Sequence, residues 1–189
     1  MVNSSMFLLQ ANTTSLISVS DLRLIAPELI LTACACVALV MEVILPYRKS
    51  KLTAYFALIG IALAFVSLGL QMASPMPIDG FYGMVRIDGF AVLFRAIFLI
   101  SAALAIGIST RFLDIEGEQH GEYYSLILFA TVGMMFIGCG YDLISLYISL
   151  ELMALTFYVL VAFTKREKKS NEAAMKYFLL GAFSSGILL

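Results

Sequence analysis

Long apolar runs separated by short polar segments fill the chain from about residue 24 onward. Six of these runs are close to the ~20 residues that an α-helix needs to cross a bilayer. Only a Gly-Tyr turn separates the fourth run from the fifth, so those two are predicted to form a tight helical hairpin. We expect membrane-spanning helices at about 24–45, 52–73, 88–110, 122–139, 141–163 and 171–189.

The two ends of the chain depart from this pattern. Residues 1–21 are rich in Ser, Thr and Asn and are predicted to form a polar N-terminal segment, followed by a transmembrane domain at 22–189. The last run stops at Leu189 without a polar anchor, so we expect the chain to be a truncated part of a longer protein.

Composition supports a membrane protein. Apolar residues make up 61% of the 189 residues and charged residues 13%, whereas a soluble domain carries about 25% charge. The net charge of −1 gives no general attraction to nucleic acid. Cys34, Cys36 and Cys139 lack the spacing of a metal or cluster site and are interpreted as small buried thiols. The predicted fold class is an all-α integral membrane protein, a polytopic bundle of transmembrane helices.

Basic residues gather in alternate loops. The loops at 46–51, 111–121 and 164–170 carry eight of them, whereas Arg23 and Arg86 lie on the opposite side. Because cytoplasmic loops of membrane proteins are enriched in Lys and Arg, the N-terminus is predicted to lie outside.

A few ionisable side chains fall inside the predicted helices. Asp142 opens the fifth helix and Glu42 lies one turn from a basic loop, so each has a local explanation. Glu28 occupies the first turn of its helix, which also favours a carboxylate, and a functional role is equally open. Arg95 lies some seven residues into the third helix and either extends outward or binds an intramembrane carboxylate.

Glu151 differs from these residues because it lies near the middle of its helix. It is about ten residues from each end, or roughly 15 Å from each interface. A carboxylate at that depth is costly and by default functional. It shares a helical stripe with Tyr147, Ala154 and Tyr158, a face that can accept water or another helix. The alternative is a protonated, hydrogen-bonded glutamate with a structural role.

Lys176 lies about one and a half turns into the sixth helix. Ser170 or Asn171 is predicted to cap that helix, and Glu172 suits its first turn. Glu172 is also four residues before Lys176, the preferred order for a helical ion pair, so a surface pair is one reading.

The other reading turns Lys176 inward. Gly181 and Ser185 form a small-xxx-small pattern that lets another helix approach, and Ser184 would extend a polar path. Lys176 and Glu151 would then influence each other's protonation and form a proton relay that needs no cofactor.

The stretch "YISLELMALTFYVLVAFTKREKKSNEAAMKYFLLGAFSSGILL" strongly resembles subunit N of the proton-pumping NADH:quinone oxidoreductase, respiratory complex I. "PELIL" in the first helix and "DGFAVLF" opening the third fit as well, so the resemblance extends from about residue 24. It implies an antiporter-like membrane subunit, longer than this chain, whose proton path includes Glu151 and Lys176. Further lysines of that family lie in later helices, which leaves open whether Glu151 and Lys176 touch or are linked through water.

The resemblance also implies where the redox chemistry occurs. The sequence has no dinucleotide-binding motif, no cysteine set for a cluster and no histidine pair for haem. This chain is therefore predicted to be a translocase subunit without a cofactor of its own, with NADH, FMN, iron–sulfur clusters and quinone in partner subunits. Its expected partners are the other membrane subunits of complex I and the lipid bilayer. Its expected location is the bacterial inner membrane, with an organellar inner membrane as the alternative.

Two other functions are compatible with the sequence. One is a subunit of a multi-subunit cation/proton antiporter, which would share the Glu and Lys. The other is a structural membrane subunit whose charges only assemble helices.

Overall fold

The computed structural model of the chain describes residues 19–44, 50–73, 76–116, 121–164 and 167–189. It is a helical membrane protein, which confirms the predicted fold class. Over the described residues the elements are, in chain order, α2 (Val19–Leu24), α3 (Ala26–Ile44), α4 (Ser50–Gln71), β1 (Ile78–Gly80), η2 (Phe81–Gly83), β2 (Val85–Ile87), α5 (Gly89–Glu116), α6 (Glu122–Cys139), α7 (Leu143–Val161) and α8 (Lys168–Leu188).

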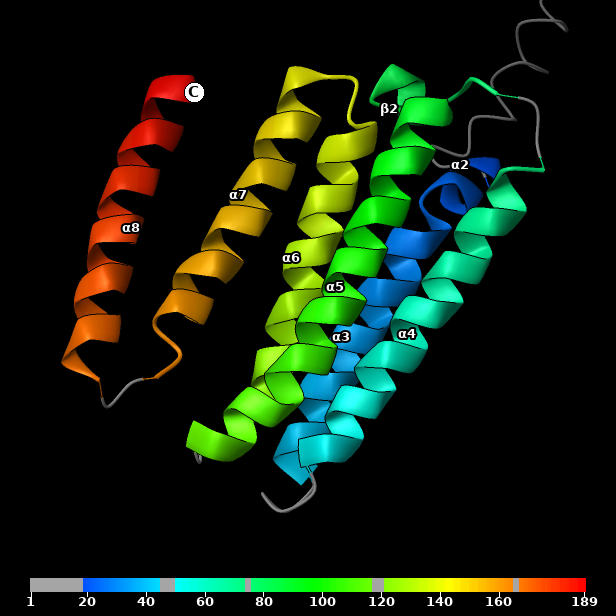
Figure 1. Cartoon of the computed structure of the whole chain (residues 1–189). Coiled ribbons are helices and arrows are strands. Elements are labelled where there is room, and N and C mark those ends of the chain that lie inside the picture. Colours follow the sequence, from blue (N-terminus) through cyan, green and yellow to red (C-terminus); the bar gives the residue numbers. More distant parts are fainter. Residues whose placement is uncertain (1–18, 45–49, 74–75, 117–120, 165–166) are drawn as a thin grey trace, which may run out of the picture.

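Helices α3, α4, α5 and α6 pack side by side, as Figure 1 shows. Their buried side chains form one apolar core. Their buried side chains recur at helical spacing, as in the pairs Leu99 and Ile106 on α5 and Leu128 and Met135 on α6. Helix α7 packs against α6, and α8 packs against α7 at the edge of the array (Figure 1). Residues of α6, α7 and α8 line two hollows described below, and the surface along these three helices is called the groove of α6, α7 and α8.

The inward face of α3 is apolar between two acidic residues. Glu28, Leu31, Ala35 and Ala38 are buried along one stripe of this helix. Glu42 continues the stripe at the other end, about 21 Å away along the axis. Its carboxylate contacts the start of α6, where a Cβ at Gly121 would overlap the Glu42 Oε2 atom.

Five of the described helices are long and apolar enough to cross a membrane: Ala26–Ile44, Leu52–Gln71, Gly89–Leu113, Glu122–Cys139 and Leu143–Val161. Helix α8 is not among them, because its first half carries Lys168, Lys169, Glu172 and Lys176. The sixth membrane span therefore stays a prediction, although a helix does occupy the corresponding residues.

The predicted cap of α8 at Ser170 or Asn171 is wrong. The helix begins at Lys168, and Glu167 occupies the N-cap position with an extended backbone. Ser170 instead donates its hydroxyl to the carbonyl of Val161, the last residue of α7, at 2.7 Å. That bond ties the first turn of α8 to the end of the preceding helix.

A short β-hairpin covers one end of the bundle, in a region where the sequence predicted no element. Strands β1 and β2 are antiparallel, with Ile78 opposite Ile87. The turn between them passes through left-handed backbone at Phe81, Tyr82 and Gly83. The hairpin is joined to the α6–α7 turn by a bond from the Tyr141 amide to the Met84 carbonyl, at 2.9 Å.

The helix ends sort into two groups along the bundle. At one end of the bundle lie the helix ends that the α3–α4, α5–α6 and α7–α8 connections join (Figure 1). At the other end lie α2, the hairpin and the α6–α7 turn. The basic loops predicted to share one side therefore join helix ends that do lie together.

Candidate functional site

Glu151 meets α8 through one hydrogen bond. The Ser185 hydroxyl donates to Glu151 Oε2 at 2.9 Å. Ser185 is the buried residue of α8, a helix described over its whole length, whereas its neighbour Ser184 is exposed. The structure thus places Ser185 against the carboxylate. The role of Ser184, predicted to extend a polar path from Lys176, stays a prediction. The sequence signal for Ser185 was its place in the small-residue pattern with Gly181.

Tyr158 lies between α7 and α8, two turns from Glu151. It is buried, and its ring makes edge contacts with Tyr177 and Phe178 at centroid distances of 5.0 and 5.5 Å. Its hydroxyl lies where a Cβ on Gly181 would be. Only a glycine leaves room for the phenol to lie across α8 at this point. Within the small-xxx-small pattern, Gly181 therefore makes space for the Tyr158 side chain, in addition to letting the two helices approach each other.

Lys176 faces away from Glu151. Its Nζ lies 2.6 Å from Glu172 Oε1, and both side chains are about two-thirds exposed, at 70% and 66%. Ser185 is nine residues further along α8, which puts the two residues about half a turn apart around the helix. The structure therefore has the Glu172–Lys176 pair, and in the described part of the chain no hydrogen bond or ion pair joins Lys176 to Glu151.

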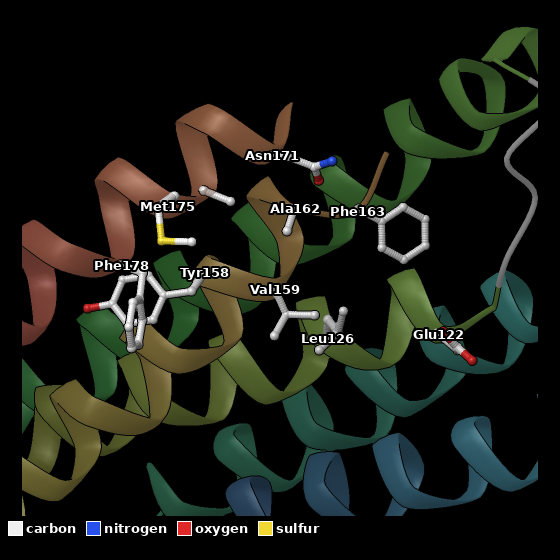
Figure 2. Close-up of a pocket in the computed structure, with 10 residues that line it drawn as sticks. Glu122, Leu126, Tyr158, Val159, Ala162, Phe163, Asn171, Met175 and Phe178 are labelled. Carbon is white, nitrogen blue, oxygen red and sulfur yellow. The ribbon is translucent and has the colours of Figure 1, made fainter. Parts of the chain in front are cut away.

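Two hollows follow the groove of α6, α7 and α8. One, of about 570 Å³, is shown in Figure 2 and lies near the basic-loop end; it is lined by Glu122, Tyr158, Asn171 and Phe178, among others. The second, of about 530 Å³, is lined by Tyr147, Leu150 and Leu188. On α7, Glu151 stands between the tyrosines of the two hollows, one turn after Tyr147 and two turns before Tyr158.

A second buried centre lies at the hairpin end of the bundle, apart from this groove. Arg95 Nη2 is 2.7 Å from Glu28 Oε1, and both side chains are 0% exposed. The sequence left open whether Arg95 extends outward or binds an intramembrane carboxylate. The structure has the second arrangement, and the carboxylate is that of Glu28. Glu28 Oε2 and Arg95 Nε are buried without a hydrogen-bond partner among the described residues.

Gln71 completes this centre, and the sequence did not single it out. Arg95 Nη1 reaches Gln71 Oε1 at 3.3 Å and the Leu24 carbonyl at 3.4 Å. The Gln71 amide donates to the carbonyls of Arg23 and Leu24 at 2.7 and 3.2 Å. These are the last carbonyls of α2, where a positive charge is favourable. The sequence did contain one sign of this role, because Gln71 is a polar residue at the end of the long apolar run of α4.

Asp142 has the structural role that its position predicts. Its carboxylate accepts a hydrogen bond from the Ile144 amide at 3.2 Å and caps α7. The three cysteines are free, and Cys139 is buried. His120 lies outside the described residues, as does the polar segment before Val19.

The chain matches known proteins in sequence and in structure. Residues 140–189 match a family described as "NADH:quinone oxidoreductase/Mrp antiporter, TM". NADH-quinone oxidoreductase subunit N 1 of Koribacter versatilis (strain Ellin345) is 47% identical over 181 residues, which are 92% of this chain and 35% of that protein. Subunit N of Trichlorobacter lovleyi is 41% identical over 180 residues, covering 94% of this chain and 36% of that protein.

Among solved structures, respiratory complex I from Thermus thermophilus with bound aureothin matches with a TM-score of 0.68 and 28% identity. The match covers 85% of this chain and 34% of that one. The chain thus spans about a third of the length of the relatives that it matches.

Together, the helical array and these matches define an antiporter-like membrane domain. Within that class the chain belongs to the family of NADH-quinone oxidoreductase subunit N, as its sequence resemblance predicted.

Proposed function

We propose that this chain is part of a membrane-arm subunit of the proton-pumping NADH:quinone oxidoreductase and that Glu151 carries protons in the groove of α6, α7 and α8. The observation that carries the proposal is the mid-helix position of Glu151, where its carboxylate accepts a hydrogen bond from Ser185 of α8. Along α7 it lies between Tyr147 and Tyr158, which line the two hollows. An ionisable group at that depth in a membrane helix is by default functional and is typical of proton relays.

Lys176 belongs to the same proposed path, on the far side of α8. Because its ammonium lies on the exposed face of that helix, its link to Glu151 runs through α8 or through water and not through direct contact. Tyr147 and Tyr158 line the two hollows, and their hydroxyls are groups able to donate and accept hydrogen bonds to water.

Glu28 and Arg95 have a structural role in this proposal. The Glu28 carboxyl group lies 2.7 Å from the Arg95 guanidinium, and both side chains are fully buried, so the pair joins α3 to α5. We assign it to holding these helices together and not to proton transfer. Ser184, which is exposed, is likewise assigned no part in the transfer, and Glu172 enters the proposal only as the ion-pair partner of Lys176.

The redox reaction belongs to partner subunits. Among the described residues, no group of three or more His, Cys, Asp and Glu side chains is placed to hold a metal ion. Because the relatives of this chain are subunits of NADH-quinone oxidoreductase, NADH oxidation, FMN, the iron–sulfur clusters and the quinone site are assigned to other subunits of the complex, with this chain as a translocase component.

The proposed location is a bacterial inner membrane, with the N-terminus outside. Support comes from the grouping of the described basic residues Arg111, Lys168 and Lys169 at the helix ends opposite to α2 and the hairpin.

The test replaces Glu151 with Gln in the full-length gene and records NADH-driven proton uptake by inverted membrane vesicles. NADH:quinone turnover and the amount of assembled complex are measured in the same vesicles. We expect assembled complex with collapsed pumping and coupled turnover. Glu167→Gln serves as the matched control with near-normal values, because Glu167 is exposed and its side chain makes no cap hydrogen bond to α8. Full pumping by the Glu151→Gln complex would reject Glu151 as a proton carrier.

The second candidate is a subunit of a cation/proton antiporter, because the matched family description includes the Mrp antiporter. The two candidates differ in energy source. Proton movement that requires NADH supports complex I, whereas sodium-dependent proton flux without NADH supports the antiporter.

A further inference from the structure

Two small residues of α8 each meet a polar side chain of α7. Ser185 bonds to the Glu151 carboxylate, and Gly181 receives the Tyr158 phenol. The two positions are four residues apart and so lie on the same face of α8. Ser185 is buried, Gly181 is half-buried like Ser170 and Ala174, and the remaining positions of α8 are exposed. This face is therefore the one through which α8 meets the rest of the described chain.

We propose that Ser185 is a positioning residue for Glu151 and that its hydroxyl is where α8 responds to the charge of that carboxylate. This inference rests on the proposed function and deepens it by naming the residue that couples Glu151 to α8.

The chemistry of a hydroxyl suits this role. A serine hydroxyl has one donor and two acceptor positions, so it donates to an ionised carboxylate and accepts from a protonated one. A hydrogen bond to a charged acceptor is roughly twice as strong as one between neutral groups. Gain or loss of a proton at Glu151 therefore changes the strength and direction of the bond that holds α8 to α7.

The same helix carries Lys176 on its opposite face. Because a helix moves as a rigid element, a change at Ser185 is carried to the Glu172–Lys176 pair about half a turn around the axis. This arrangement accounts for a proton path in which Glu151 and Lys176 act together without touching.

The experiment compares three variants in the full-length gene, again with NADH-driven proton uptake, turnover and assembled complex measured in inverted vesicles. Ser185→Ala removes the hydroxyl with little change of volume, Ser185→Thr keeps it, and Ser184→Ala is the matched control on the neighbouring exposed residue. In assembled complexes we expect Ser185→Ala to lower coupled pumping roughly tenfold, the scale of one charge-assisted hydrogen bond. Ser185→Thr should recover most of it, and Ser184→Ala should behave as wild type.

A second readout does not depend on activity. The infrared band of the Glu151 carboxyl group, identified as the band lost in Glu151→Gln, should shift in Ser185→Ala and not in Ser184→Ala. An unshifted band with wild-type pumping in Ser185→Ala would overturn the inference. So would equal losses in Ser185→Thr and Ser185→Ala, because packing and not the hydroxyl would then matter.

Failure of this inference is distinguishable from failure of the proposed function. If Glu151→Gln abolishes pumping while Ser185→Ala does not, the proton path stands and the role of Ser185 falls. If Glu151→Gln pumps normally, the proposed path itself is wrong.

Discussion

The Glu28 carboxylate lies 2.7 Å from the Arg95 guanidinium, and neither side chain has any exposed surface. The two residues come from α3 and α5, and Gln71 of α4 connects Arg95 to the end of α2. Four helices thus meet at one buried charge pair. Removing one member of such a pair leaves an uncompensated charge, which costs far more than removing both.

Arg95→Met is expected to destabilise the domain by about 3–5 kcal/mol, because Glu28 would then be buried without its partner. The double variant Glu28→Leu/Arg95→Met should recover most of the loss. The measurement is the thermal unfolding of the complex in mild detergent. An Arg95→Met complex of normal stability that fails to pump would place the pair in the proton path instead.

Gly181→Ala is expected to separate α7 from α8 or to displace Tyr158, since the new Cβ would overlap the phenol hydroxyl. The matched control is Gly186→Ala on the same helix, where a Cβ meets nothing within 4 Å. We expect reduced pumping and lower thermal stability in Gly181→Ala alone. Equal behaviour of the two alanine variants would show that Tyr158 does not need this position.

Gly133→Ala tests the close packing of α6 on α7. The added Cβ would lie 2.8 Å from the Met153 backbone nitrogen and 3.0 Å from the Ser149 carbonyl oxygen, and a backbone cannot move aside as a side chain can. The expected cost is about 1–3 kcal/mol in thermal unfolding. Gly107→Ala, with open space around its Cβ, should leave stability unchanged or slightly raised.

The proposed orientation is tested by labelling. In a background without cysteine, Tyr82→Cys at the exposed hairpin turn and Lys169→Cys near the start of α8 lie at opposite ends of the bundle. A membrane-impermeant maleimide added to intact cells after opening of the outer membrane should label Tyr82→Cys and spare Lys169→Cys. The reverse pattern would put the N-terminus in the cytoplasm.

The helices of this fold were predictable from sequence because bilayer-length apolar runs and their polar breaks are local features. Glu151 was predictable for the same reason, since a lone charge in mid-helix is visible without any partner. Its contact with Ser185 was not. Which face of α8 meets α7 depends on the rotation of the helix about its own axis. The apolar residues of α8 are spread over several of its faces, so the sequence does not single out one face.

The buried centre was predicted only in part. Glu28 and Arg95 each had a local explanation, and nothing in a single sequence shows that residues 28, 71 and 95 meet. The hairpin was missed for another reason. Its turn places Phe81 and Tyr82, rather than the usual Asn or Gly, in left-handed backbone, so the residues that signal such a turn are mostly absent.

The apolar stripe of α3 between Glu28 and Glu42 has an electrical consequence. A membrane voltage is worth about 2.3 kcal/mol per elementary charge for each 100 mV. Leu31, Ala35 and Ala38 offer an ion no polar side chain on this face of α3 over the roughly 21 Å between the two carboxylates, so we expect this face to hinder ion movement through the bundle. A charged side chain placed at the fully buried Ala35 is expected to weaken that barrier and to let ions leak through the membrane at this point.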